Sequence, residues 1–81
     1  MAVSSKVKAA LNLKGKDHSS LANYLRISNQ ALSNKFYRDS FSAEDLIKIS
    51  AFLECDLAFI INDSTTIVFD ESDLKTAPKE L

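Results

Sequence analysis

The chain has 81 residues, of which 46% are hydrophobic and 26% charged, with one glycine, one proline and one cysteine. This length makes one domain, because autonomous domains usually run to about 100–150 residues. The composition is too apolar for a disordered chain and too poor in turn-forming residues for a sandwich of many short strands, so we expect mostly helix. The longest uncharged apolar run, Leu57 to Ile61, is far shorter than the roughly 20 residues that cross a bilayer. The first residues do not resemble a signal peptide, so we expect a soluble, cytoplasmic protein.

The charge is unevenly divided although the net charge is only -1. Up to Arg38 there are seven basic residues against one acidic residue, whereas from Asp39 onward there are three against ten. A polyanion would therefore bind to the basic first half of the chain. The sequence pI near 5.7 is lower than that of many nucleic-acid binders, so charge alone does not decide the matter.

The first half contains signals for two helix boundaries. From Val3 to Leu13 apolar residues recur at spacings of three and four, which predicts an amphipathic helix with Ser4 or Ser5 as its cap. Gly15 is placed to end that helix in the left-handed conformation, and the Asp17 carboxylate is placed to cap the next.

Two short helices then meet across a tight corner. The second helix is expected from about residue 18 to 25, the corner at 26–28, and the third helix from about 29 to 37, capped by the Ser28 hydroxyl. Their expected buried positions are Leu21, Ala22, Leu25, Ala31, Leu32 and Phe36.

A fourth helix follows a loop at 38–41. Ser42 is its expected cap, and Glu44 and Asp45 favour the positive end of the helix dipole. Its expected inward positions are Leu46, Ile47, Ile49, Ser50, Phe52 and Leu53.

After residue 56 the pattern changes to that of a β-hairpin, with strands at 57–61 and 65–69 and a polar turn between them. Both strands are apolar on both faces, so we expect one face to cover the helices and the other a second copy of the chain. The expected dimer contacts are Phe59, Ile60, Ile61, Ile67, Val68 and Phe69. Residues 1–69 would then form the domain, and 70–81 an acidic, mobile tail beyond a short turn around Ser72 to Lys75.

The segment HSSLANYLRISNQALSNKFY, from His18 to Tyr37, resembles the helix-turn-helix of the phage repressor and Cro family of transcription regulators. The resemblance extends from Val3 to about Leu53. It departs at Arg26, where the family favours glycine, so Arg26 either takes a left-handed conformation or the turn has a different geometry. It departs again at Lys35, where an aliphatic residue is usual. Lys35 therefore either reaches a phosphate or lies over the core.

The resemblance implies that the third helix enters the major groove of DNA while the second crosses the backbone. Each polar residue on the third helix, taken alone, would be an ordinary solvated side chain, but together on one face they favour base reading. Asn and Gln amides pair with both N6 and N7 of adenine. The implied base readers are Asn29, Gln30, Ser33 and Asn34. The implied backbone contacts are Lys16, His18, Ser19, Ser28, Lys35, Tyr37 and Arg38.

We therefore expect an α+β, mainly helical protein: a four-helix, lambda-repressor-like helix-turn-helix domain followed by a C-terminal β-hairpin. It would act as a homodimeric repressor on a near-palindromic, double-stranded operator, without a cofactor. The alternative is a protein-interaction module, such as an antitoxin or regulatory subunit, that uses the hairpin and the acidic second half. Non-specific architectural DNA binding is a third possibility.

Nothing in the sequence indicates catalysis. His18 has no partner at metal-ligand spacing, and there is no glycine-rich phosphate loop. Cys55 is expected to be a small buried hydrophobic residue, because no base can be assigned to activate its thiol. We expect neither an enzyme nor a metal protein.

Overall fold

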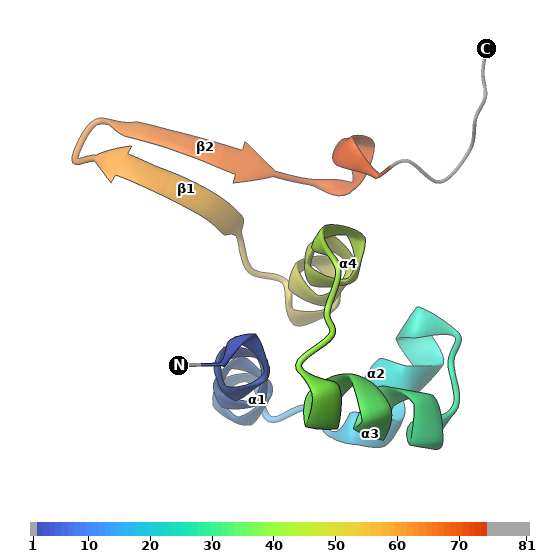
Figure 1. Ribbon diagram of the computed structural model, residues 1–81. Coiled ribbons are helices and arrows are strands. Elements are labelled where there is room, and N and C mark those ends of the chain that lie inside the picture. The colour runs from blue at the N-terminus through green and yellow to red at the C-terminus, as the bar shows by residue number, and fades with distance from the viewer. Residues whose placement is uncertain (1, 75–81) are drawn as a thin grey trace, which may run out of the picture.

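The computed structural model describes residues 2–74 and consists of a helical body with a hairpin that extends from it (Figure 1). This confirms the mainly helical α+β fold. Within these residues no helix is both long and apolar enough to span a membrane. The elements in chain order are α1 (Val3–Lys14), α2 (His18–Leu25), α3 (Asn29–Arg38), α4 (Ala43–Leu53), β1 (Leu57–Asn62), β2 (Thr65–Phe69) and the 3-10 turn η1 (Glu71–Asp73).

The three expected side-chain caps are present at the starts of α2, α3 and α4. Asp17, Ser28 and Ser42 each accept a hydrogen bond from the backbone N–H three residues further on, at 2.8, 3.0 and 3.0 Å. At α4 the Asp45 carboxylate in turn accepts a hydrogen bond from the Ser42 backbone N–H at 3.0 Å, which completes a capping box. These local bonds satisfy N–H groups that a helix cannot pair internally, so they fix where each helix begins.

The start of α1 is held differently from the prediction. Neither Ser4 nor Ser5 caps it; the capping position is Ala2, whose side chain makes no such bond. Instead the backbone N–H of Ser4 donates to Asp39 Oδ1 at 2.6 Å, and this bond lowers the pKa of the Asp39 carboxyl. The cap of α1 is therefore supplied by the residue that ends α3, and it joins the two helices.

All four helices end on a residue in the left-handed conformation. Gly15 has φ 66°, as expected, but the other three positions are Arg26, Asp39 and Glu54, with φ of 62°, 55° and 56°. In each helix the following residue donates its N–H to the carbonyl five residues back, at 3.0 Å. Arg26 therefore takes the left-handed alternative, at the cost that this conformation carries for residues with a Cβ.

Substituting glycine at these three positions distinguishes the cost of the left-handed backbone from the contribution of the Asp39 carboxylate that caps α1. Arg26→Gly and Glu54→Gly are each expected to raise the free energy of unfolding by about 0.5–1 kcal/mol, because glycine adopts positive φ without steric cost. Asp39→Gly removes the same strain but also the carboxylate that caps α1, so it should be the least stable of the three. Urea denaturation of the three variants measures this order, and equal gains at all three positions would contradict it.

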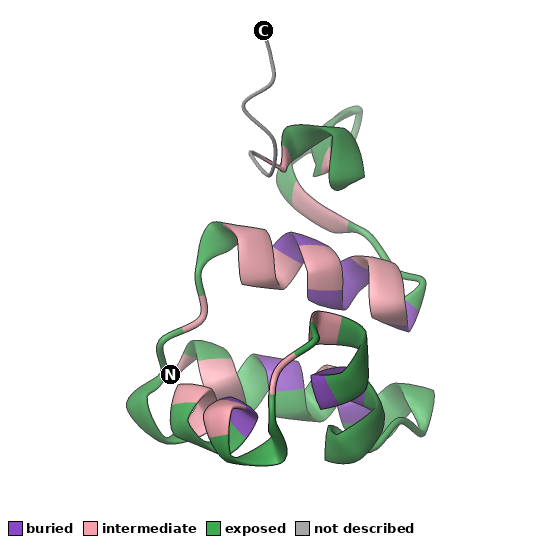
Figure 2. Cartoon of the chain, turned by 90° about the vertical axis from the view of Figure 1, so that its right-hand side faces the viewer, coloured by how far each residue is buried: buried purple, intermediate pink, exposed green. Residues whose placement is uncertain are grey.

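The core contains one leucine from each helix, at most 2% exposed: Leu11, Leu21, Leu32 and Leu53. Val7, Ala22 and Ile49 complete the cluster, and Phe36 is half-buried against it. In Figure 2 the buried segments lie on the helices, none on the hairpin. The predicted buried positions Leu21, Ala22 and Leu32 are confirmed, while Ala31 and Leu25 are half-buried.

The hairpin does not cover the helices in the way the sequence suggested. Its strands are antiparallel, with Leu57 opposite Phe69, and one irregularity between Ile60 and Asn62. Only Leu57, Ala58 and Phe69, at its base, are half-buried; the other strand residues are exposed on both faces. The expectation that one face packs on the helices is wrong for most of the hairpin, because β1 leaves α4 in a direction that leads away from the helical body (Figure 1).

Two further expectations concern the ends of these strands. Cys55, expected to be buried, is exposed, because it lies in the surface link between α4 and β1. The short turn expected around Ser72 to Lys75 is η1, at Glu71–Asp73. Residues 75–81, and the predicted mobility of the tail with them, lie outside the described residues.

Candidate nucleic-acid interface

The corner between α2 and α3 is held by buried side chains from both helices. Leu21 and Ala22 on α2 and Leu32 on α3 are 0–2% exposed and belong to the same cluster. Ile27, in the corner, packs on that cluster and donates its backbone N–H to the Ala22 carbonyl at 3.0 Å. These contacts set the position of α3 relative to α2.

The outward face of α3 carries the four residues that the sequence singled out as base readers. Asn29, Gln30, Ser33 and Asn34 are all exposed. Gln30 Nε2 donates to Asn34 Oδ1 at 3.4 Å, a weak bond one helical turn apart. The hairpin lies on the other side of the helical body, beyond α4, so it does not cover this face (Figure 1).

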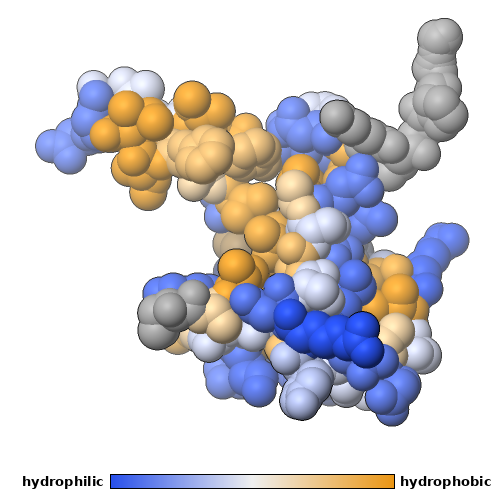
Figure 3. All heavy atoms as spheres, viewed as in Figure 1, coloured by the Kyte–Doolittle hydropathy of each residue, from blue (hydrophilic) through white to orange (hydrophobic). Residues whose placement is uncertain are grey.

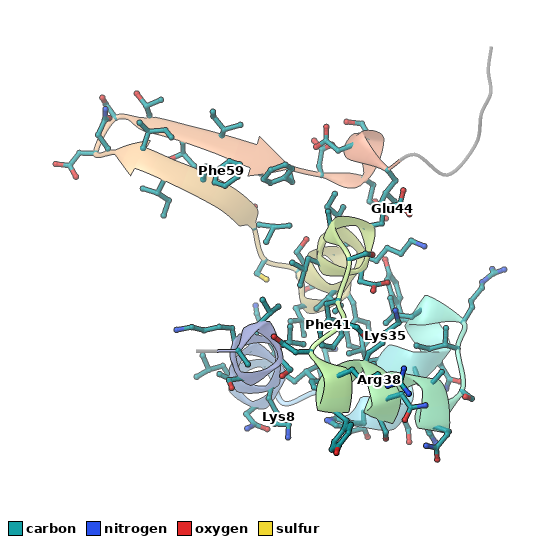
Figure 4. All side chains as sticks on the ribbon, in the orientation of Figure 1. Lys8, Lys35, Arg38, Phe41, Glu44 and Phe59 are labelled. Carbon is teal, nitrogen blue, oxygen red and sulfur yellow. The ribbon has the colours of Figure 1, made fainter. Side chains whose placement is uncertain are left out.

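The carboxyl end of α3 carries two exposed side chains and one paired side chain. Tyr37 is 90% exposed and Arg38 is also exposed, whereas Lys35 Nζ forms a salt bridge with Asp45 Oδ2 at 2.9 Å. Figure 4 shows Lys35 on the α4 side of α3. The ammonium of this lysine is therefore partly neutralised by Asp45.

The Lys35–Asp45 pair is partly buried, and Asp45 also caps the start of α4. Burial opposes ionisation of Asp45, but hydrogen bonds from the Lys35 ammonium and from the Ser42 backbone outweigh burial and lower the pKa of the carboxyl. Asp45 thus stays charged while it caps α4 and binds α3. Lys35 is thus half-buried in an ion pair with α4, and its expected contact with a phosphate stays a prediction.

Residues from α1, α2 and the α3–α4 loop surround the Phe36 ring of α3, near the amino end of α2. His18 is exposed, and its ring stacks on Phe36 with centroids 4.6 Å apart and planes 4° apart. Lys8 Nζ lies 5.7 Å from the centroid of the same ring, and Phe41 packs edge-on against it at 5.1 Å. Ser19, next to His18, is exposed. The sequence did not indicate that Lys8 belongs to this cluster, because Phe36 lies 28 residues further along the chain and no local pattern connects the two.

Lys16 and Ser28, the remaining expected backbone contacts, lie at other points of the domain. Lys16 Nζ is 5.5 Å from the ring centroid of Phe52 on α4, and Tyr24 on α2 packs against the same ring at 5.2 Å. Ser28 is exposed at the start of α3, where its Oγ accepts from the Ala31 backbone N–H. The hydroxyl hydrogen of Ser28 is left to donate to another acceptor.

The residues expected at a dimer interface form an apolar surface that the helices leave uncovered. Figure 3 shows apolar side chains along the hairpin and on the surface below its base. Phe69, at the base, is the only half-buried member of the expected set. The exposed fractions of the others are 59% for Phe59, 78% for Ile60, 59% for Ile61, 54% for Ile67 and 47% for Val68.

Two apolar hollows adjoin the hairpin base. One, of about 270 Å³, lies between α1, α4 and the start of β1, with Val3, Ala10 and Leu57 in its lining. The other, of about 240 Å³, lies between α4 and the hairpin, with Leu46 and Phe69 in its lining. The apolar surface of the hairpin therefore continues onto the helical body.

Residues 2–64 match the family model of the bacteriophage CI repressor helix-turn-helix domain. The chain belongs to this family. The match runs from the start of α1 through the turn of the hairpin, so it includes all four helices, and it confirms the resemblance to phage repressors. This CI repressor domain is thus a DNA-binding regulator. No curated protein and no solved structure matches the chain.

Proposed function

We propose that this CI repressor domain binds a near-palindromic operator as a homodimer, with α3 in the major groove of each half-site. The observation that carries the proposal is the division of α3 into two faces. Leu32 is fully buried in the core, while Gln30 and Asn34 are exposed on the opposite side of the helix and Asn29 is exposed in its first turn. A helix anchored on one face and polar on the other fits the width of the major groove.

The polar face of α3 suits the reading of adenine. The amides of Gln30 and Asn34 each offer a donor and an acceptor, which match N7 and N6 of adenine in the major groove. The weak bond between these amides favours side-chain orientations that point along the same face. Asn29 and Ser33 lie on this face and extend the proposed contact over neighbouring base pairs.

Phosphate contacts around α3 would fix the register of the domain on the duplex. Arg38 and Tyr37 are exposed at one end of α3, and Ser28 at the other. His18 and Ser19 lie at the amino end of α2, where N–H groups and the helix dipole favour anions. Lys16 completes the set. Lys35 is left out, because its ammonium is already bound to Asp45.

The exposed hairpin supports the homodimer. An isolated two-stranded hairpin is marginally stable in water, and this one has apolar side chains exposed on both faces. A second copy would cover these side chains, and the same surface on both subunits gives a two-fold interface. Such a dimer places its α3 helices roughly 34 Å apart, one turn of DNA, and repression follows from occupying the operator.

Selection of bound sequences from a random pool of duplex DNA tests the proposal as a whole. We expect enrichment of an inverted repeat with half-site centres about 10 base pairs apart. A pool without any enriched sequence, or one enriched for a single asymmetric site, would contradict the dimeric reading of an operator.

The exposed hairpin also fits the rival proposal of a module that binds a different protein. The acidic residues near it, Asp63, Asp70, Glu71 and Asp73, would suit a basic partner, although they also protect an edge strand from aggregation. Affinity for duplex DNA at two salt concentrations separates the proposals. A DNA reader binds at low salt and loses affinity steeply as salt rises, whereas a module that binds only protein does neither.

A further inference from the structure

We infer that Lys8, on α1, is a further DNA phosphate contact, and that the Phe36 ring, on which His18 of α2 also stacks, positions its ammonium. The inference rests on the proposed DNA binding and adds a contact from a helix outside the helix-turn-helix itself. Lys8 Nζ and the His18 ring both lie against Phe36, at 5.7 and 4.6 Å between centres. Figure 4 shows Lys8 on the side of α1 away from the hairpin.

The position of Lys8 is fixed by contacts on both sides of it in the chain. One helical turn earlier, the backbone N–H of Ser4 is bound to Asp39 at the end of α3. Val7 and Leu11 are 6% and 2% exposed in the core, which sets the rotation of α1 about its axis. Residues four apart share a face of a helix, so Lys8 is directed to the carboxyl end of α3, where Phe36 lies.

The chemistry of this contact leaves the lysine able to bind an anion. An aromatic ring attracts an ammonium through its negative face but does not neutralise its charge. This differs from Lys35, whose ammonium is paired with a carboxylate at 2.9 Å. Phe36 thus limits the orientations of Lys8 and leaves it its full positive charge, against the same ring that His18 stacks on.

Lys6 provides a matched control on the same helix. It is also exposed, but it lines the apolar hollow between α1, α4 and the start of β1, whereas Lys8 lies against Phe36. Lys6→Gln and Lys8→Gln make the same change of charge in the same helix, two residues apart. They differ in whether the lost charge lies beside Phe36 on α3 or beside the start of β1.

The test is the salt dependence of affinity for duplex DNA, measured by fluorescence anisotropy on the full chain. Each phosphate contact contributes about 0.9 to the slope of log affinity against log salt. We expect Lys8→Gln to lower the slope by about that amount for specific and random DNA alike. Lys6→Gln should leave it unchanged, and Lys8→Arg should retain it. Thermal unfolding of each variant verifies that the fold is intact.

The role of Phe36 is tested by combining Phe36→Leu with Lys8→Gln. If Phe36 acts through Lys8, Phe36→Leu should weaken DNA binding more when Lys8 is present than when it is absent. Equal losses in both backgrounds would overturn the positioning role of the ring. A Lys8→Gln slope equal to that of the unaltered protein would overturn the inference but leave the proposed function standing. If the unaltered protein shows no salt-dependent binding, the proposed function itself fails.

Discussion

Ile60→Lys is expected to convert the protein into a folded monomer and to weaken operator binding by at least about 100-fold, the scale of the avidity that two linked sites provide. Ile60 is 78% exposed in the middle of β1, so the helical core does not depend on it. In a two-fold interface the substitution would introduce its charge twice, next to apolar side chains that cannot solvate it. Sedimentation analysis gives the mass, and anisotropy gives the affinity.

Leu13→Lys is the matched control for this prediction. Leu13 is 88% exposed on α1 and lines neither hollow at the hairpin base, so the same change of chemistry there should alter neither mass nor affinity. Two results would contradict the hairpin dimer: an Ile60→Lys protein that remains dimeric, or an unaltered protein that is monomeric when bound to a full operator.

The sequence was informative where the signals are local. Asp17, Ser28 and Ser42 located the starts of three helices, because a capping side chain bonds a backbone N–H only three residues away. Gly15 located the end of α1 because glycine favours the left-handed conformation. The family resemblance rested on a compact segment of this kind, and the polar face of α3 followed directly from helical periodicity.

The sequence was uninformative where a contact joins distant positions. The cap of α1 comes from Asp39, 35 residues away, so the nearer serines were a plausible but wrong choice. The partner of Lys35 lies on another helix, so the sequence left its role open. The direction of the hairpin depends on the path of the link through Cys55 after α4. The spacing of apolar residues gives no information about that path. Lys8 belongs to this group too, since its contact with Phe36 exists only once α1 crosses the end of α3.

Gln30→Ala and Asn34→Ala are expected to reduce discrimination between the operator and sequences altered at the contacted base pair by about 1–3 kcal/mol each. Arg38→Ala should weaken binding to all sequences by a similar factor and lower the salt slope by about 1, because a phosphate contact carries no sequence information. Asn12→Ala removes an exposed amide from α1 and serves as the control, with no expected change in either quantity. The measurement is a competition series with operators altered at single positions, repeated at two salt concentrations.

If α3 reads bases, the amide variants and the Arg38 variant must affect different quantities, the former specificity and the latter overall affinity. Loss of an amide leaves affinity for random DNA nearly unchanged, because the phosphate contacts remain, so its effect falls on the ratio of specific to random binding. Loss of Arg38 leaves that ratio unchanged, because both affinities fall together. Gln30, Asn34 and Arg38 follow one another at intervals of four residues in α3, so the amides and the guanidinium lie along one side of the helix. Identical behaviour of Gln30→Ala, Asn34→Ala and Arg38→Ala would therefore refute base reading by α3, even in a protein that binds DNA tightly.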